Sequence, residues 1–153
     1  MCFGKKMQIC GLLAGPRIDD VEDNVFHTSS RINSTWGGNL VDMARAMRYL
    51  EIIEEENLLD NAKQRGKELQ QELSAIQQEY PDKISNARGR GMFCAFDLKK
   101  ELRQAFLDKC FENGLMILPC GKNSVRFRPP LNLKSKQLKD GMAVVRKVLS
   151  EII

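Results

Sequence analysis

Hydrophobic side chains recur every three or four residues in two long stretches of this sequence, a spacing that predicts two amphipathic helices. The first helix is expected to begin after Gly37 and the second to end at Pro81, because proline disrupts a helix interior. The apolar positions are Leu40, Met43, Met47, Leu50 and Ile53, and then Leu58, Ala62, Leu69, Leu73, Ile76 and Tyr80. Gly66 lies inside the second stretch, where it costs roughly 1 kcal/mol relative to alanine, so we expect another element to pack closely there.

After Pro81 the pattern alternates between short apolar strands and helical stripes. The sequence Arg-Gly-Arg-Gly at residues 88–91 predicts a turn, and Gly114 is expected to end a helix in the left-handed conformation. Ser135 is expected to cap a last helix with its side chain. The predicted strands cover residues 92–98, 115–118 and 124–128, and the predicted helices cover residues 100–113 and the stretch after Ser135. Residues 57–153 are therefore expected to form a compact α+β unit.

The first segment has a different pattern, because its apolar run lacks a helical period. Residues 7–14 are mostly apolar and are followed by Gly15 and Pro16, which predicts a buried strand that ends in a turn. A buried strand needs neighbouring strands, and little sequence precedes this one. We therefore expect residues 1–56 to belong to a larger domain.

Composition narrows the classes of function. The 153 residues are 42% hydrophobic and 29% charged, and the net charge of +4 comes from basic residues interleaved with acidic ones. No stretch combines basic and aromatic residues as a nucleic-acid platform does. No apolar run approaches the roughly 20 residues of a membrane span, and no leader sequence opens the chain. These features predict a cytoplasmic protein that binds neither nucleic acid nor membranes.

The cysteines and the single histidine argue against a metal site. The five cysteines are scattered, lie in apolar runs and form no CxxC pair, so reduced cytoplasmic thiols are expected. His27 has no evident partner. The acidic runs at residues 19–20 and 54–56 lie where solvated turns or helix ends are expected, and we assign no chemistry to them.

A lysine pair lies just before the first apolar run. Taken alone, Lys5 and Lys6 favour a surface turn. If Phe3 and Ile9 pack against Lys5 at the start of the strand, however, the ammonium group of Lys5 is partly desolvated, and desolvation lowers its pKa. A lysine that loses its proton near neutral pH can attack a carbonyl and form a Schiff base.

The sequence Ser-Thr-Trp-Gly-Gly at residues 34–38 precedes the first helix and allows two interpretations. In the first, a hydroxyl of Ser34 or Thr35 only caps the helix. In the second, hydroxyls, backbone N–H groups and the helix dipole bind a phosphate, and the two glycines let the ligand approach the backbone.

Two arginines alternate along the strand at residues 124–128. Strand geometry places Val125 and Phe127 on one face and Arg126 and Arg128 on the other. Such a pair is often only solvated, but an arginine that points into a cleft can bind a carboxylate through two parallel hydrogen bonds.

These three features and the Gly-Arg-Gly sequence occur in an order that resembles the class III aminotransferases, which are fold-type I enzymes that use pyridoxal phosphate. The resemblance covers essentially the whole chain. Residues 3–11 and 31–42 are similar to the L-lysine 6-aminotransferase branch, and residues 88–94 and 124–129 are also shared with 4-aminobutyrate aminotransferases. The pair Gly37-Gly38 favours the lysine branch, because the sister group has Leu-Gly there.

The resemblance implies an α/β fold with parts of two domains. Residues 1–56 would be the end of the large cofactor-binding domain with its connecting helix, and residues 57–153 would be the small α+β C-terminal domain. It also implies a homodimer.

The resemblance further implies roles for individual residues. Lys5 would form the Schiff base with pyridoxal phosphate and carry the proton between the substrate carbon and the cofactor. Thr35, with Ser34, would bind the cofactor phosphate of the neighbouring subunit. Arg126 would bind the α-carboxylate of the substrate, with Lys6 and Arg128 in support.

The implied reaction moves the ε-amino group of L-lysine to 2-oxoglutarate and forms glutamate and 2-aminoadipate 6-semialdehyde. The family's upstream cofactor motifs have no counterpart in the sequence, so we expect a C-terminal fragment that is inactive by itself. Two alternatives stay open. The enzyme could act on another ω-amine, such as 4-aminobutyrate or ornithine, or the chain could be a non-catalytic fragment that only packs on a full-length subunit.

Overall fold

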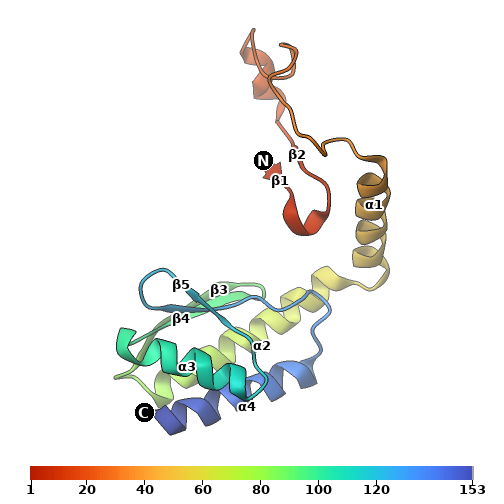
Figure 1. Ribbon diagram of the computed structural model, residues 1–153. Coiled ribbons are helices and arrows are strands. Elements are labelled where there is room, and N and C mark those ends of the chain that lie inside the picture. Colours follow the sequence, from red (N-terminus) through yellow and green to blue (C-terminus); the bar gives the residue numbers. More distant parts are fainter. Residues whose placement is uncertain (153) are drawn as a thin grey trace. The chain divides into compact units, whose positions relative to one another are not determined.

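The chain divides into two compact units, unit 1 (Met1–Glu56) and unit 2 (Asn57–Ile153). A computed structural model describes residues 1–152, and for Lys6 it describes the backbone only. The elements of unit 1 are β1 (Cys2–Phe3), the 3-10 helices η1 (Lys5–Met7) and η2 (Pro16–Asp20), β2 (Gly11–Leu12) and α1 (Leu40–Glu55) (Figure 1).

The first apolar run forms a small hairpin and not the buried strand that residues 7–14 predict. Only Gly11 and Leu12 are extended, and they pair antiparallel with β1, so that Phe3 faces Gly11. Lys5 and Gln8 adopt positive φ angles of 53° and 63°, which fold the chain into a tight turn between the strands. A turn of this kind cannot be inferred from apolar periodicity, and this is why the prediction was wrong.

Helix α1 begins after Gly37 and carries the apolar stripe, as predicted, but its cap is a different residue. The side chain of Asn39 accepts hydrogen bonds from the N–H groups of Val41 and Asp42, at 3.0 and 3.3 Å. These amides lack acceptors within a helix, so the asparagine stabilises the first turn. Neither Ser34 nor Thr35 caps the helix, and the capping interpretation of these two residues is wrong.

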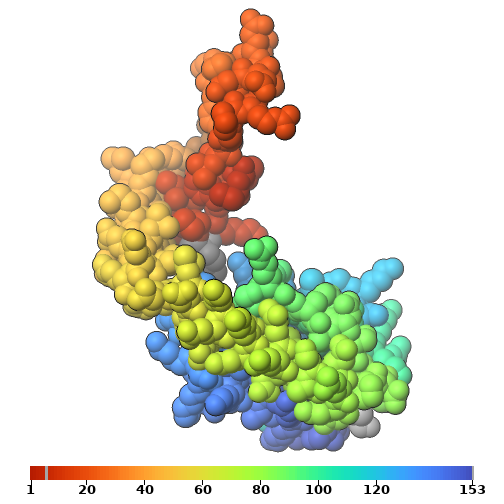
Figure 2. All heavy atoms as spheres, turned by 180° about the vertical axis from the view of Figure 1, so that it is seen from behind, coloured from red at the N-terminus to blue at the C-terminus, as the bar shows by residue number. Residues whose placement is uncertain are grey.

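Unit 2 is a two-layer α+β structure with one antiparallel sheet. Its strands lie in the order β3-β4-β6-β5, and each strand pairs antiparallel with its neighbour. The helices cover one face of the sheet (Figure 1), and the unit is closely packed in the space-filling view of Figure 2. Its elements are α2 (Leu58–Glu79), β3 (Ile84–Arg90), β4 (Phe93–Leu98), α3 (Lys100–Glu112), β5 (Leu118–Cys120), β6 (Ser124–Phe127) and α4 (Ser135–Ile152).

The core of unit 2 lies between the sheet and its helices. Alternation along β4 buries Cys94, Phe96 and Leu98, as the period of a half-buried strand requires. The ring of Phe96 lies 5.9 Å from that of Phe106 and 5.7 Å from that of Phe127, measured between ring centroids. This cluster joins β4 and β6 to α3.

Two glycines of unit 2 act as the sequence predicts. A Cβ atom added to Gly66 would lie 2.4 Å from the carbonyl carbon of Gly91, so α2 approaches the β3–β4 turn too closely for any side chain. Gly114 has a φ angle of +80° and follows α3. The N–H groups of Gly114 and Leu115 donate to the carbonyls of Phe111 and Cys110, at 2.9 and 2.8 Å, and so end the helix.

Three local predictions for unit 2 were wrong. The strand predicted at residues 115–118 is displaced, because β5 covers Leu118–Cys120 and residues 115–117 only lead into it. Residues 88–90 continue β3 and pair with β4, and the turn begins only at Gly91. Ser135 is the first residue of α4, and its hydroxyl donates to Glu68 at 3.1 Å. Within the described residues, no helix has both the length and the apolar character that a membrane span requires.

Candidate functional site

Lys5 lies on the turn of the first hairpin in a strained conformation. Its φ angle of 53° places a non-glycine residue in the left-handed region, and its carbonyl accepts a hydrogen bond from the N–H of Gln8 at 2.9 Å. Such conformations cost about 1–3 kcal/mol and gather at functional sites. The side chain of Lys5 is exposed, so it lacks the partial desolvation that Phe3 and Ile9 were expected to give it.

The ring of Phe3 shows why Lys5 is left exposed. A Cβ atom added to Gly11 would lie 2.3 Å from the Cζ atom of Phe3, so the ring covers the glycine across the hairpin and not the lysine. The predicted supporting role of Lys6 concerns a side chain outside the described part of the structure.

Residues 34–38 form a turn that is separate from the first turn of α1. The N–H of Gly37 donates to the carbonyl of Ser34 at 3.1 Å, and a Cβ atom on Gly37 would lie 3.0 Å from that of Ser34. Gly38 has a φ angle of +75°, which favours glycine. The glycines therefore serve the turn itself.

This turn leaves a smaller anion site than expected. Asn39 already accepts from two of the first N–H groups of α1, so these two amides are not available to a ligand. Ser34 and Thr35 are exposed, and among the described residues their hydroxyls make no hydrogen bond. Two hydroxyl groups remain as possible ligands of a phosphate.

Arg126 lies on the face of the sheet that is opposite to the core, as strand alternation predicts. Val125 and Phe127 on either side of it are buried, and Arg126 pairs with Ala95 of β4 and Leu118 of β5. The Nε atom of Arg126 is buried and has no hydrogen-bond partner in the described chain. An unsatisfied buried donor is costly, commonly about 1–3 kcal/mol, so this atom suits an acceptor from outside the chain.

Arg128 is exposed beyond the end of β6. It lines an apolar cavity of about 130 Å³ together with Ile117, Phe127 and Met142. Because most of the lining is aliphatic or aromatic, this cavity offers little to a carboxylate.

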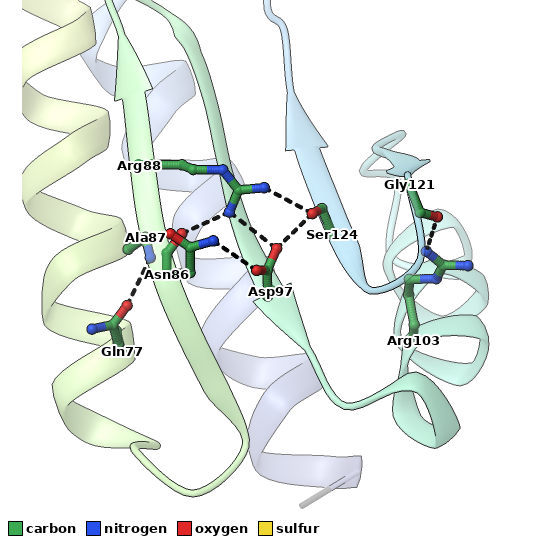
Figure 3. A network of polar contacts seen from close by, with 8 residues as sticks. All are labelled: Gln77, Asn86, Ala87, Arg88, Asp97, Arg103, Gly121 and Ser124. Carbon is green, nitrogen blue, oxygen red and sulfur yellow. Dashed lines mark hydrogen bonds and ion pairs between the residues drawn. The ribbon is translucent and has the colours of Figure 1, made fainter.

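A polar network that the sequence did not predict surrounds Asp97 (Figure 3), one pair along the β4–β6 ladder from Arg126 on the same face. The carboxylate of Asp97 accepts hydrogen bonds from Arg88 at 3.0 Å, from Asn86 at 2.8 Å and from Ser124 at 2.5 Å. Burial by itself raises the pKa of Asp97, but these hydrogen bonds and the charge of Arg88 outweigh burial and hold the pKa below its ordinary value. The sequence did not reveal this network because residues 88–91 were predicted to form a turn, and a turn does not place Arg88 on a strand next to Asp97.

The remaining polar candidates have structural contacts. His27 lies 3.3 Å from the side-chain nitrogen of Asn24 and 3.1 Å from the carbonyl of Glu22. Asn24 is buried and donates to the carbonyls of Ile18 and Val21, so it organises the loop after η2. Among the residues described, no group of His, Cys, Asp or Glu side chains is arranged to hold a metal ion.

The candidate residues are divided between the two units. Lys5, Ser34 and Thr35 belong to unit 1, and Arg126 belongs to unit 2. Residues 1–149 match the family described as aminotransferase class-III.

The chain belongs to the class III aminotransferases. It is 49% identical to the L-lysine-epsilon aminotransferase of Amycolatopsis lactamdurans over 152 residues, which are 98% of this chain and 34% of that protein. It is 45% identical to the protein of the same name from Mycobacterium tuberculosis over 150 residues, which are 97% of this chain and 33% of the relative. The chain thus spans about a third of the length of the curated relatives it matches.

Solved structures agree with this assignment. A lysine aminotransferase from M. tuberculosis in the internal aldimine form superposes with a TM-score of 0.92 at 44% identity, over 99% of this chain and 35% of that one. An ornithine aminotransferase from Plasmodium yoelii gives a TM-score of 0.75 at 25% identity, over 82% of this chain and 34% of its own. The predicted α/β fold of a fold-type I aminotransferase is confirmed, and the family depends on pyridoxal phosphate.

Proposed function

We propose that this chain is the C-terminal part of a homodimeric aminotransferase that moves the ε-amino group of L-lysine to 2-oxoglutarate. The products would be glutamate and 2-aminoadipate 6-semialdehyde. Two relatives named L-lysine-epsilon aminotransferase are 45–49% identical over almost the whole chain, whereas a named ornithine aminotransferase is 36% identical over 76% of it. The higher identity favours lysine as the amino donor.

In this proposal, Lys5 attaches the cofactor. Its exposed amine lies on a strained turn, which presents it to a carbonyl group without a competing ion pair among the described residues. Bound pyridoxal phosphate supplies the electron sink for the reaction. Lys5 supplies the amine and then holds and returns the proton of the substrate carbon at its Nζ atom.

Ser34 and Thr35 are proposed to bind the cofactor phosphate of the neighbouring subunit. Both hydroxyls are exposed and can donate to phosphate oxygens, and the closed turn at Gly37 and Gly38 limits their motion. The exposure of Trp36 next to them, at 74%, is consistent with a surface that a second subunit covers.

Arg126 is proposed to bind the α-carboxylate of the substrate, and its buried, unsatisfied Nε atom is the observation that carries the proposal. A guanidinium can place two parallel hydrogen bonds on a carboxylate, which fixes the orientation of the substrate as well as its affinity. In this proposal, the carboxylate of the substrate accepts the hydrogen bond that no described group of the chain accepts from the Nε atom.

The test is a chimera in which this chain replaces the aligned 152 residues of the A. lactamdurans relative. We expect lysine-dependent formation of glutamate. We also expect Arg126→Gln to lower kcat/KM about 30- to 160-fold, as the loss of a charge-assisted pair of about 2–3 kcal/mol implies. Thr35→Val should weaken retention of the cofactor. Lys122→Gln, which removes one exposed charge from the β5–β6 turn, is the matched control.

The same chimera separates the competing functions. A preference for ornithine or 4-aminobutyrate over lysine in direct competition would favour an enzyme for another ω-amine. A folded chimera without turnover for any of the three donors would favour a non-catalytic chain. Retention of full activity by Arg126→Gln would contradict the role given to this arginine.

A further inference from the structure

Two arginines flank one alanine on the outer face of the sheet in unit 2. Arg88 of β3 pairs with Ala95 of β4, and Ala95 pairs in turn with Arg126 of β6. Directly paired residues of neighbouring strands point to the same face. The small side chain of Ala95 therefore leaves the space above β4 open to both guanidinium groups.

One carboxylate lies within reach of both arginines. Asp97 is two residues beyond Ala95 on the same face and pairs with Ser124, which is two residues before Arg126. Diagonal neighbours of this kind are separated by roughly 7–8 Å, a distance that long side chains can span. By position alone, Asp97 could pair with either Arg88 or Arg126.

In the structure, Arg88 holds this carboxylate. Its Nη1 atom lies 3.0 Å from Asp97, and its Nη2 atom donates to the hydroxyl of Ser124 at 2.8 Å, so that its side chain reaches across β4 (Figure 3). Its Nη1 atom also donates to the carbonyl of Asn86 at 2.8 Å. These three acceptors fix the guanidinium of Arg88 beside Asp97 and Ser124, and the hydroxyl of Ser124 itself donates to Asp97.

Arg126 has no share in this network. No ion pair or hydrogen bond joins it to Asp97 or to any other described side chain, and its Nε atom is buried without an acceptor. We propose that Arg88 is a positioning residue that occupies Asp97 and thereby keeps the guanidinium of Arg126 free for the carboxylate of a substrate.

This inference rests on the proposed role of Arg126 and adds a condition to it. A carboxylate beside a carboxylate-binding arginine competes with the substrate, because both offer the same acceptor atoms. Arg88 removes this competition because it neutralises the charge of Asp97 and, together with Asn86 and Ser124, occupies its oxygens. Without Arg88, Asp97 would turn to Arg126.

The test uses the 153-residue chain labelled with ¹⁵N, and it follows the side-chain Nε–H signal of Arg126. In Arg88→Gln we expect this signal to shift and to exchange more slowly with solvent, because Asp97 now accepts from Arg126. With glutarate as the dicarboxylate probe, the dissociation constant at Arg126 should rise about tenfold, the ratio that 1.4 kcal/mol represents.

A double variant separates positioning from a purely structural role. Arg88→Gln combined with Asp97→Asn removes the competing charge, so the Arg126 signal and the glutarate affinity should return to those of the parent chain. If Arg88 served only to hold the sheet together, the double variant would be no better than the single one. Arg90→Gln, on the same strand and exposed, is the matched control and should leave the Arg126 signal in place.

Other outcomes distinguish this inference from the proposed function. If Arg126→Gln binds glutarate as tightly as the parent chain does, Arg126 does not bind the carboxylate and the proposed function fails at this residue. The pairing of Asp97 with Arg126 is tested separately, by the Arg126 signal of Arg88→Gln in the absence of glutarate. An unchanged Arg126 signal in a folded Arg88→Gln would overturn the inference. If Arg88→Gln does not fold, Ser124→Ala is the second variant, because it removes one partner of both Arg88 and Asp97. It should shift the Arg126 signal in the same direction by a smaller amount. An unchanged Arg126 signal in Ser124→Ala would also overturn the inference.

Discussion

The two units differ most in how they bury apolar side chains. Among the described residues, Ala46 is the one buried hydrophobic residue of unit 1, and all other members of the buried core belong to unit 2. Helix α1 of unit 1 has a regular apolar stripe, yet Leu40 is 79% exposed and Leu50 is 54% exposed. In unit 2 the helical stripes of α2 and α4 are covered by the sheet and by each other.

This difference shows what an amphipathic pattern specifies. The pattern sets the helix and the side that is to be buried, but the burial itself depends on a partner surface. Unit 2 contains its own partner surfaces, whereas α1 presents its stripe to solvent in this chain. We therefore expect the stability of the chain to come mainly from unit 2, while the candidate residues Lys5 and Thr35 lie in the less stable unit.

The largest effect is expected from the core of unit 2. Phe96→Ala removes a fully buried ring that contacts Phe106 and Phe127, and should lower the free energy of unfolding by about 3–5 kcal/mol. Leu50→Ala in the exposed stripe of α1 should change it by less than about 0.5 kcal/mol. Urea unfolding of the chain measures both, and equal losses would contradict the difference between the units.

Next in size is the close contact of α2 with the β3–β4 turn. Gly66→Ala places a Cβ atom 2.4 Å from the backbone of Gly91 and should destabilise unit 2 by about 1–3 kcal/mol. The matched control is Gly141→Ala in α4, where the nearest atom, Cδ1 of Leu115, is 3.6 Å away. There the better helix propensity of alanine should stabilise by up to about 1 kcal/mol, and thermal unfolding of both variants tests the contrast.

A smaller and more local effect is expected in unit 1. Asn39→Ala removes the acceptor of the Val41 and Asp42 N–H groups and should destabilise the start of α1 by about 1 kcal/mol. Hydrogen exchange of these amides should become faster, while the amides of β4 and β6 keep their rates. Faster exchange in both units would show that the units unfold together.

The effect of pH on the Asp97 network should be the smallest. Because the folded pKa of Asp97 lies below its unfolded value, its stabilising contribution is present above the unfolded pKa and is lost as the pH falls through the folded pKa. Asp97→Asn should therefore cost about 1 kcal/mol at neutral pH, and this difference should shrink below about pH 4 and vanish at lower pH. Unfolding curves between pH 7 and pH 2 measure it, and a constant difference would contradict the assignment.

Hydrophobic periodicity alone predicted most of the helices and the alternation of β6. It predicted α1 and α2 closely, and the alternation of β6 correctly placed Arg126 opposite to the buried Val125 and Phe127. The resemblance to a family supplied the candidate roles, which no periodic pattern contains.

The features that the sequence did not predict depend on single backbone angles. Positive φ angles at Lys5 and Gln8 turn an apolar run into a hairpin. A positive φ angle at Asn86, with a shift in strand register after Ser85, places Arg88 beside Asp97. The pattern of apolar residues does not show where a residue other than glycine adopts a left-handed backbone conformation. Neither the exposure of Lys5 nor the Asp97 network could therefore be inferred from the sequence.

Covalent trapping tests the central claim, that Lys5 is the residue to which the cofactor is attached. The chimera with the A. lactamdurans relative, loaded with pyridoxal phosphate, would be reduced with borohydride, digested and mapped by mass spectrometry. The account predicts one phosphopyridoxyl group on Lys5, which is lost in Lys5→Ala. A label on Lys6 or on another lysine of the folded chimera, with Lys5 unmodified, would contradict it.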